Sequence, residues 1–159
     1  MKWPLILVAM IALAVNPCIA ADLPALGDPP PALALPSLDG KLIDISQYYG
    51  KPLIVTFFAT WSKSCQDEIK ALQELKDQYG STLEVVAISF DKKSKTLSEF
   101  VEANKLKLNF LVDKKLLSLN QYAVLIIPTT FCINASGKID KILVDYDDNV
   151  KQTLSDWLK

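Results

Sequence analysis

A cysteine and a serine stand three residues apart in the segment Trp61–Cys65 (WSKSC), and the Cys65 thiol is its most chemically capable group. A thiolate attacks a disulfide and forms a mixed disulfide, whereas the hydroxyl of Ser62 can neither form nor exchange one. The other cysteines of the chain are Cys18 and Cys132. The segment therefore offers single-thiol chemistry at Cys65, with no neighbouring thiol to resolve a mixed disulfide.

The residue types missing from the chain exclude several other kinds of site. Its 17 basic residues are all lysine, and it contains no histidine. Without histidine there is no Ser–His or Cys–His activation and no imidazole ligand for a metal ion. Without arginine, and with a net charge of −1, the chain lacks the basic surface that binds nucleic acid. We expect no metal, no cofactor and no nucleic-acid partner.

The first 20 residues are typical of a signal peptide for export. Lys2 precedes an apolar run over residues 5–15, which is broken at Pro17 and followed by the small residue Ala20. We expect cleavage after Ala20, with an uncleaved membrane anchor or a lipid attached to Cys18 as alternatives. The rest of the chain is then periplasmic or otherwise extracytoplasmic, and it remains tethered to the membrane if the segment is retained.

The exported part divides into a Pro-rich leader over residues 21–31 and one domain over residues 32–159. Half of the chain is hydrophobic, which is enough apolar material for a single core. The unbroken apolar run Leu53–Phe58 predicts a central strand covered on both faces. Apolar residues at helical spacing then run from Cys65 to a capping glycine, Gly80.

The alternation of strands and helices predicts an α/β fold with a mixed central β-sheet flanked by helices and an N-terminal β-hairpin. The other expected elements are a hairpin of Leu33–Pro36 with Lys41–Ile45, strands at Leu83–Phe90, Asn109–Asp113, Pro128–Ile133 and Lys138–Val144, and helices near Leu97–Asn104, Lys114–Tyr122 and Val150–Leu158.

Several dispersed segments, in this order, resemble the thioredoxin superfamily, in particular its TlpA-like branch of exported thiol-disulfide oxidoreductases, which is related to the AhpC/TSA redoxins. They are Leu38–Lys41, Gly50–Pro52, Phe57–Trp61, Ile127–Phe131 and Asn134–Lys138. The resemblance covers most of residues 32–159 and implies a thioredoxin-like fold. It also implies a cis Ile127–Pro128 bond that faces the Cys65 turn, beside a groove where the backbone pairs with an extended client peptide.

The resemblance further implies the site residues. The first cysteine of the family's Cys-x-x-Cys motif corresponds to Ser62, its second cysteine to Cys65, and a glutamate three residues further to Glu68. Ser62 can still cap the helix by accepting a hydrogen bond from the Cys65 N–H. The helix N-terminus and Lys63 favour a lowered pKa of Cys65. In this fold, however, the second cysteine is usually the less accessible one, so a reactive thiol and a half-buried remnant both remain open.

Two further side chains have a structural and a chemical interpretation. Glu68 lies one helical turn beyond Cys65 and could relay a proton, but we expect a solvated acid on the helix surface, the commoner fate of a glutamate. Cys132 lies four residues along the strand from Pro128, about 13 Å away at the rise of a β-strand, which disfavours a disulfide with Cys65. We expect it to be a small core residue.

The main interpretation is an exported protein of the thiol-disulfide oxidoreductase family that acts on client thiols or disulfides through Cys65, with a membrane-bound electron donor as a further partner. The alternative is a non-catalytic module that holds an extended peptide at Trp61, Ile127 and Pro128. The segment also matches the short Thr/Ser-x-x-Cys motif of peroxiredoxins. The absence of arginine, and Phe58 where those enzymes have proline, disfavour a peroxidase.

Overall fold

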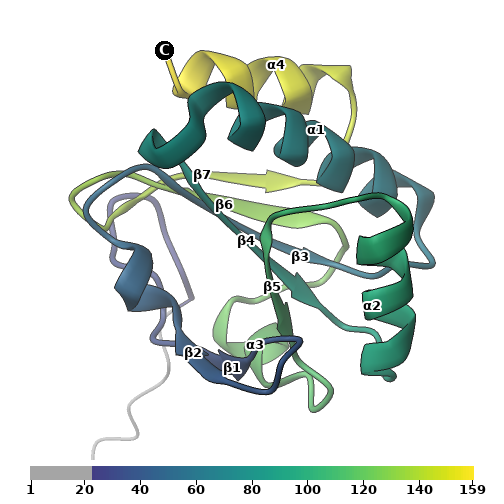
Figure 1. The fold of residues 1–159 in the computed structure, drawn as a ribbon. Coiled ribbons are helices and arrows are strands. Elements are labelled where there is room, and N and C mark those ends of the chain that lie inside the picture. Colours follow the sequence, from purple (N-terminus) through teal and green to yellow (C-terminus); the bar gives the residue numbers. More distant parts are fainter. Residues whose placement is uncertain (1–22) are drawn as a thin grey trace, which may run out of the picture.

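The computed structural model describes residues 23–159 (Figure 1). Its strands are β1 (Ala34–Pro36), β2 (Leu42–Asp44), β3 (Leu53–Phe58), β4 (Glu84–Ser89), β5 (Asn109–Val112), β6 (Thr129–Ile133) and β7 (Ile139–Val144). Its helices are η1 (Ile45–Tyr48), α1 (Lys63–Tyr79), η2 (Gly80–Thr82), α2 (Ser94–Ala103), α3 (Leu117–Gln121) and α4 (Asp148–Trp157). Within these residues no helix is both long and apolar enough to cross a membrane.

The central sheet is mixed, as the alternation of elements predicts. Its five strands have the order β5-β4-β3-β6-β7; β3, β4 and β5 are parallel, and β6 and β7 are antiparallel to their neighbours. All six residues of β3 are buried, which confirms that Leu53–Phe58 is the central strand. Two antiparallel strands, β1 and β2, form the expected N-terminal hairpin.

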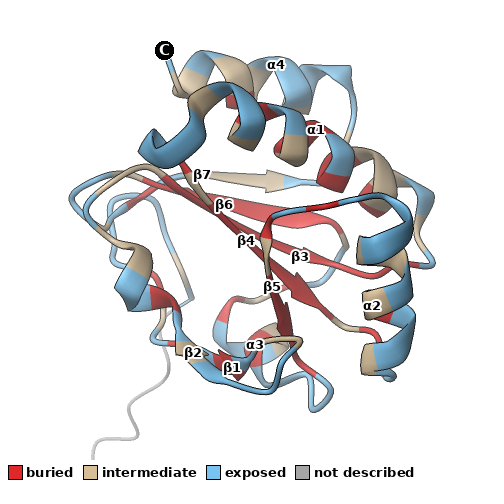
Figure 2. Cartoon of the chain, in the orientation of Figure 1, coloured by how far each residue is buried: buried red, intermediate tan, exposed pale blue. Residues whose placement is uncertain are grey.

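Each face of the sheet carries its own apolar core because successive side chains of β3 alternate between the faces. Ile54 and Phe58 pack with α1, α2 and α4 on one face. Val55 and Phe57 pack on the other face with the hairpin, η1 and the segment that contains Tyr122. Figure 1 shows α1 and α4 side by side over the first face and α3 with the hairpin on the opposite side. The central strands are buried along their length (Figure 2).

Most predicted elements occur within one or two residues of the expected bounds, but the helix predicted from Lys114 is shorter. It begins only at Leu117, because Leu116 adopts a left-handed backbone conformation with φ 56°. The Asp113 carboxylate accepts hydrogen bonds from the backbone N–H groups of Leu117 and Ser118. A buried aspartate therefore caps this helix and sets its start.

The predicted signal peptide lies outside the described residues, whereas most of the Pro-rich leader lies within them. It has no regular helix or strand, as expected, yet it is attached to the domain. The Gly27 N–H donates to the Ile139 carbonyl at 2.8 Å, and the Tyr122 hydroxyl donates to the Pro31 carbonyl at 2.7 Å. Residues Gly27 and Pro31 of the leader are therefore hydrogen-bonded to the domain.

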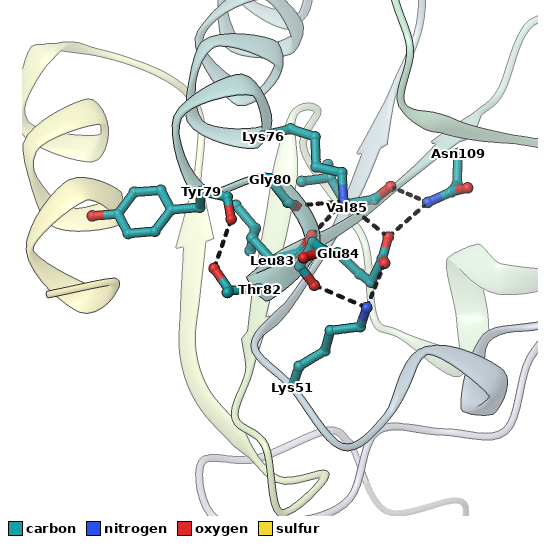
Figure 3. Close-up of polar contacts among 10 residues, drawn as sticks. Lys51, Lys76, Tyr79, Gly80, Thr82, Leu83, Glu84, Val85 and Asn109 are labelled. Atoms are coloured by element: carbon teal, nitrogen blue, oxygen red, sulfur yellow. Dashed lines mark hydrogen bonds and ion pairs between the residues drawn. The ribbon is translucent and has the colours of Figure 1, made fainter.

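A polar cluster around Glu84 joins the C-terminal end of α1 to the starts of β3 and β4 (Figure 3). The ammonium groups of Lys51 and Lys76 lie 2.8 and 3.4 Å from the Glu84 carboxylate oxygens. The Asn109 side chain donates to the same carboxylate and to the Val85 carbonyl. Partial burial raises the pKa of Glu84, but the hydrogen bond and charge of Lys51 and the charge of Lys76 outweigh it, so the pKa is lowered.

Candidate functional site

The turn that carries Ser62 and Cys65 connects the C-terminal end of β3 to α1. Ser62 has extended backbone angles, φ −92° and ψ 126°, and its hydroxyl accepts a hydrogen bond from the Cys65 N–H at 3.4 Å. This confirms the predicted N-cap. The serine therefore preserves the start of the helix at a position where a cysteine would supply a second thiol.

Cys65 is completely buried, with 0% of its surface exposed. Burial raises the pKa of its thiol; hydrogen bonds with the Ser62 side chain and the Ala59 backbone oppose the rise, and the charges of Glu68 and Asp145 add to it. The expected lowering of this pKa is wrong, because desolvation has a larger effect than the hydrogen bonds that lower it. Cys65 is a neutral thiol at neutral pH.

Lys63 does not supply the positive charge expected beside Cys65. Its ammonium group is exposed and pairs with both carboxylate oxygens of Asp67, one turn further along α1. The charge of Lys63 is thus balanced on the outer face of the helix, and it does not stabilise a Cys65 thiolate.

Glu68 is also completely buried, so the expectation of a solvated surface acid is wrong. Its carboxylate accepts hydrogen bonds from the hydroxyls of Thr56 at 2.8 Å and Thr130 at 2.7 Å. These threonines lie directly opposite each other on β3 and β6, with their hydroxyl oxygens 2.8 Å apart. The side chain of Glu68 therefore closes a triangle of three oxygen groups under α1.

The hydrogen bonds of this triangle are complete only when Glu68 is protonated. Three oxygen–oxygen contacts need three hydrogen atoms, and the hydroxyls of Thr56 and Thr130 supply only two. Protonation of Glu68 supplies the third. Burial raises the pKa of Glu68 to about 7, the two threonine hydrogen bonds oppose the rise, and the charge of Asp145 adds to it. Glu68 therefore exchanges a proton near neutral pH.

The titratable groups around Glu68 provide no positive charge. Cys65, Cys132 and Tyr146 each have a raised pKa, caused mainly by burial and increased by the charge of Glu68. All three are neutral at pH 7. The only charged group that acts on Glu68 among the causes of its shift is Asp145, which has the same sign. Within residues 23–159, no cation contributes to the pKa of the buried Glu68 carboxyl group.

Cys132 is confirmed as a core residue. It lies on β6 opposite Ile54, two positions beyond Thr130, and burial raises the pKa of its thiol to about 12. Neither Cys65 nor Cys132, the cysteines of the described part of the chain, forms a disulfide. The folded domain thus contains one thiol at the turn and one in the core.

The predicted client-binding residues are only partly brought together. The Ile127–Pro128 bond is cis, as predicted. Trp61, 75% exposed, and Ile127 line one pocket of about 520 Å³ together with Phe90 and Leu119. Pro128 is buried and is not part of this pocket, and its carbonyl accepts a hydrogen bond from the Asp145 N–H. Trp61 and Ile127 therefore form the open surface beside the turn.

One further residue, Asp91, holds the turn in place. Its carboxylate accepts hydrogen bonds from the backbone N–H and the hydroxyl of Thr60, at 3.0 and 2.8 Å. The Thr60 carbonyl accepts another from the side chain of Gln66 at 2.7 Å. The sequence contains a signal for this contact, because β3 and β4 are neighbouring parallel strands and the residues after them meet at one edge of the sheet.

No group of three His, Cys, Asp or Glu side chains within residues 23–159 is arranged to hold a metal ion. The chemistry available at the turn is therefore that of one neutral thiol and one acid that titrates near pH 7. Such a pair can transfer a proton and form a single disulfide bond with an external sulfur.

Comparisons with known proteins agree with this geometry. The sequence profile of the AhpC/TSA family matches residues 26–142. The thioredoxin-like protein YneN of Bacillus subtilis is 32% identical over 121 residues, which cover 74% of this chain and 71% of YneN. The thiol-disulfide oxidoreductase ResA of Geobacillus thermodenitrificans is 30% identical over 133 residues, which cover 82% of this chain and 76% of ResA.

Solved structures show the same fold. A protein described as the thiol:disulfide interchange protein DsbE from Chlorobium tepidum superposes with a TM-score of 0.78 at 25% identity, over 84% of this chain and 94% of that one. StoA from Bacillus subtilis superposes with a TM-score of 0.67 at 23% identity, over 82% and 98% of the two chains, a likeness of fold alone. The chain belongs to the AhpC/TSA family and is a thioredoxin-fold relative of the thiol-disulfide oxidoreductases.

Proposed function

We propose that this protein carries out single-thiol exchange with disulfide-bearing client proteins, using Cys65. The observation that carries the proposal is that one thiol, Cys65, and one buried acid, Glu68, whose pKa is about 7, lie one turn apart on α1. With Ser62 at the first position of the motif, the turn cannot form a disulfide of its own and so cannot donate the two electrons that a dithiol gives up. The exchange is therefore neutral in redox terms.

The sulfur chemistry balances without an oxidant or reductant. The Cys65 thiol loses its proton, and the thiolate attacks one sulfur of a client disulfide, forming a new S–S bond as the client S–S bond breaks. The second client sulfur leaves as a thiolate and takes up a proton. When a client thiol attacks the mixed disulfide, Cys65 is released and the client has exchanged its disulfide partner.

Glu68 is proposed as the group that accepts and returns this proton. At neutral pH about half of the Glu68 side chains are ionised, which is the condition under which an acid gives and takes protons most readily. Because Cys65 is buried and its pKa is raised, exchange is expected to be slow and to need a client that reaches the sulfur.

The test is to form the mixed disulfide with a disulfide-linked peptide and weigh the intact protein by mass spectrometry. The wild-type protein and Cys132→Ala should gain one peptide, and Cys65→Ala should gain none. The rate in Glu68→Gln should fall severalfold near pH 7. An adduct that persists in Cys65→Ala, or no adduct on the wild type after hours at pH 9, overturns the proposal.

A second variant tests whether the residues around the turn still support disulfide reduction when the first cysteine of the motif is present. Ser62→Cys places a second thiol at the first position of the motif, so it should reduce a peptide disulfide catalytically with dithiothreitol as the electron source, whereas the wild type should not. Net electron transfer would require the membrane-bound donor that the resemblance implies. The single-thiol exchange requires no donor.

The second candidate function is a client-binding module without covalent chemistry. The complete burial of Cys65 favours it, because the sulfur is out of reach of a client in this conformation. Under this alternative a client binds at Trp61 and Ile127, and its affinity is the same for the wild type and Cys65→Ala. The mass measurement above distinguishes the two functions.

We also propose that the protein is exported, with residues 1–20 removed as a signal peptide, leaving a leader over residues 21–31 before the domain. Mass spectrometry of the N-terminal peptide of the mature protein should then begin at Ala21. A mature chain that still begins at Met1 would instead support the membrane-anchored alternative.

A further inference from the structure

The pocket beside the turn has an apolar floor and a positively charged rim. Trp61, Phe90, Leu119 and Ile127 line the apolar part, within a volume of about 520 Å³. This volume is in the range of pockets that hold small ligands, so it accommodates at least one large apolar side chain. An exposed apolar hollow of this kind, next to the turn of Ser62 and Cys65, is typical of binding surfaces.

The rim is formed by Lys92 and Lys93, which follow β4 in the loop before α2. Both are exposed, and neither forms an ion pair within residues 23–159. Lys95, three positions beyond Lys92, pairs with Glu99 instead. The rim therefore presents two ammonium groups that a ligand can neutralise.

The one carboxylate in the pocket wall, Asp91, is buried and already occupied. Its oxygens accept hydrogen bonds from Thr60 and from the Ser89 hydroxyl at 2.7 Å. Asp91 therefore fixes the turn and leaves the lysine ammonium groups without a hydrogen-bonded counter-charge.

The opposite side of the turn is acidic. Asp145 is close enough to raise the pKa of both Cys65 and Glu68, and Asp147 and Asp148 follow it at the start of α4. A ligand that lies across the turn thus meets positive charge on the β4–α2 side and negative charge on the β7–α4 side. Charge complementarity therefore favours a ligand with acidic groups on the β4–α2 side and fixes the orientation in which it binds.

We propose that the pocket beside the turn, lined by Trp61 and Ile127, binds a large apolar side chain of an extended client segment. The residues next to that side chain are acidic and form ion pairs with Lys92 and Lys93. The inference rests on the proposed function in naming the client, but it concerns recognition and does not depend on the reactivity of Cys65. The inference names the class of client. Its acidic residues lie beside Lys92 and Lys93, and any basic residues lie toward Asp145.

The test measures the binding of fluorescein-labelled peptides to full-length Cys65→Ala by fluorescence anisotropy. Each peptide has a central leucine, flanked by glutamates, glutamines or lysines. The glutamate peptide should bind about tenfold more tightly than the lysine peptide, and the difference should shrink severalfold in 0.5 M salt, since rim charges are screened. Trp61→Ala should weaken the binding of every peptide.

The double charge reversal Lys92→Glu/Lys93→Glu should abolish or invert the peptide preference. The matched control is Lys105→Glu/Lys107→Glu, which changes the charge equally at two exposed lysines outside this pocket and should leave the preference intact. Equal affinity for all three peptides, or the same loss in both double variants, overturns the inference.

Failure of the two proposals can be told apart. A charge-dependent affinity in Cys65→Ala, together with no mixed disulfide in the wild type, rejects the exchange function and retains the acidic-client inference. A mixed disulfide that forms at the same rate with glutamate- and lysine-flanked disulfide peptides retains the exchange function and rejects the inference.

Discussion

Two glutamates near opposite ends of helix α1 have opposite environments. Glu84, at the start of β4, lies between the ammonium groups of Lys51 and Lys76 near the C-terminal end of the helix, and its pKa is lowered (Figure 3). Glu68, under the first half of the helix, has two threonine hydroxyls and no cation, and its pKa is raised to about 7.

The difference shows which partner determines the protonation state of a sheltered carboxyl group. A cation stabilises the ionised form, so Glu84 is a fixed charge that ties α1 to the sheet. Hydroxyl groups offset the effect of burial only in part, so the pKa of Glu68 stays raised to about 7 and its protonation state changes near neutral pH. The first arrangement fixes a charge that joins two elements, and the second leaves a carboxyl group that titrates near pH 7.

The largest expected effect is on the pH dependence of stability through Glu68. Its folded pKa is raised above the unfolded value, so stability is greatest below pH 4.5 and falls as the pH rises toward 7. The shift to about 7 corresponds to a loss of about 3 kcal/mol in the free energy of unfolding. Glu68→Gln should remove this loss, as measured by urea denaturation at pH 5 and pH 8. An unchanged pH dependence would contradict the assignment.

Thr130→Val tests the hydroxyl side of the triangle. The variant keeps the shape of the side chain but removes a hydrogen bond from Glu68 and from Thr56. At pH 8 the ionised carboxylate needs its hydrogen-bond donors, so the free energy of unfolding should fall by about 2 kcal/mol. The decrease should be smaller at pH 5. Equal destabilisation at the two pH values would show that only packing was lost.

Glu84→Gln should have a smaller effect with the opposite pH dependence. Because the pKa of Glu84 is lowered in the folded state, its contribution is present above the unfolded pKa near 4.5 and is lost as the pH falls through the folded value. The variant should be less stable by about 1 kcal/mol at pH 7, with a smaller difference in high salt and a difference that shrinks as the pH falls below 4.5. A loss of the same size at every pH would point to packing.

Ser62→Ala should have the smallest effect. The serine cap of α1 is a single hydrogen bond at 3.4 Å, so its removal should cost about 0.5–1 kcal/mol at every pH. The experiment also separates the two roles of the position, because Ser62→Cys should restore dithiol chemistry while Ser62→Ala should not. A pH-dependent loss in Ser62→Ala would link the cap to Glu68.

The elements that position the site follow from local sequence patterns. The apolar run of β3, the helix that ends at Gly80 and the Ser62 cap depend on residues near one another in the chain. The cis bond before Pro128 was expected from the family resemblance and is present. These features are predictable because each depends on backbone preference or on a motif of a few residues.

The protonation states at the site were not predictable in the same way. The pKa of Glu68 is raised because its carboxyl group is buried between α1 and the sheet, where its hydrogen-bond partners Thr56 and Thr130 are joined by a strand register across 74 positions. Cys65 is desolvated by side chains from the sheet and other helices, which a helix-terminus argument does not include. Both depend on tertiary packing, and a single sequence carries no direct signal for it.

The most direct test is an NMR titration of the side-chain carboxyl carbons of both glutamates in one folded sample. We expect the Glu68 signal to titrate with a midpoint near 7 and the Glu84 signal to titrate below 4.5, with the protein folded throughout the measured range. If Glu68 instead titrates together with Glu84, the buried acid is an ordinary fixed charge, and its proposed role as the proton acceptor of Cys65 is wrong.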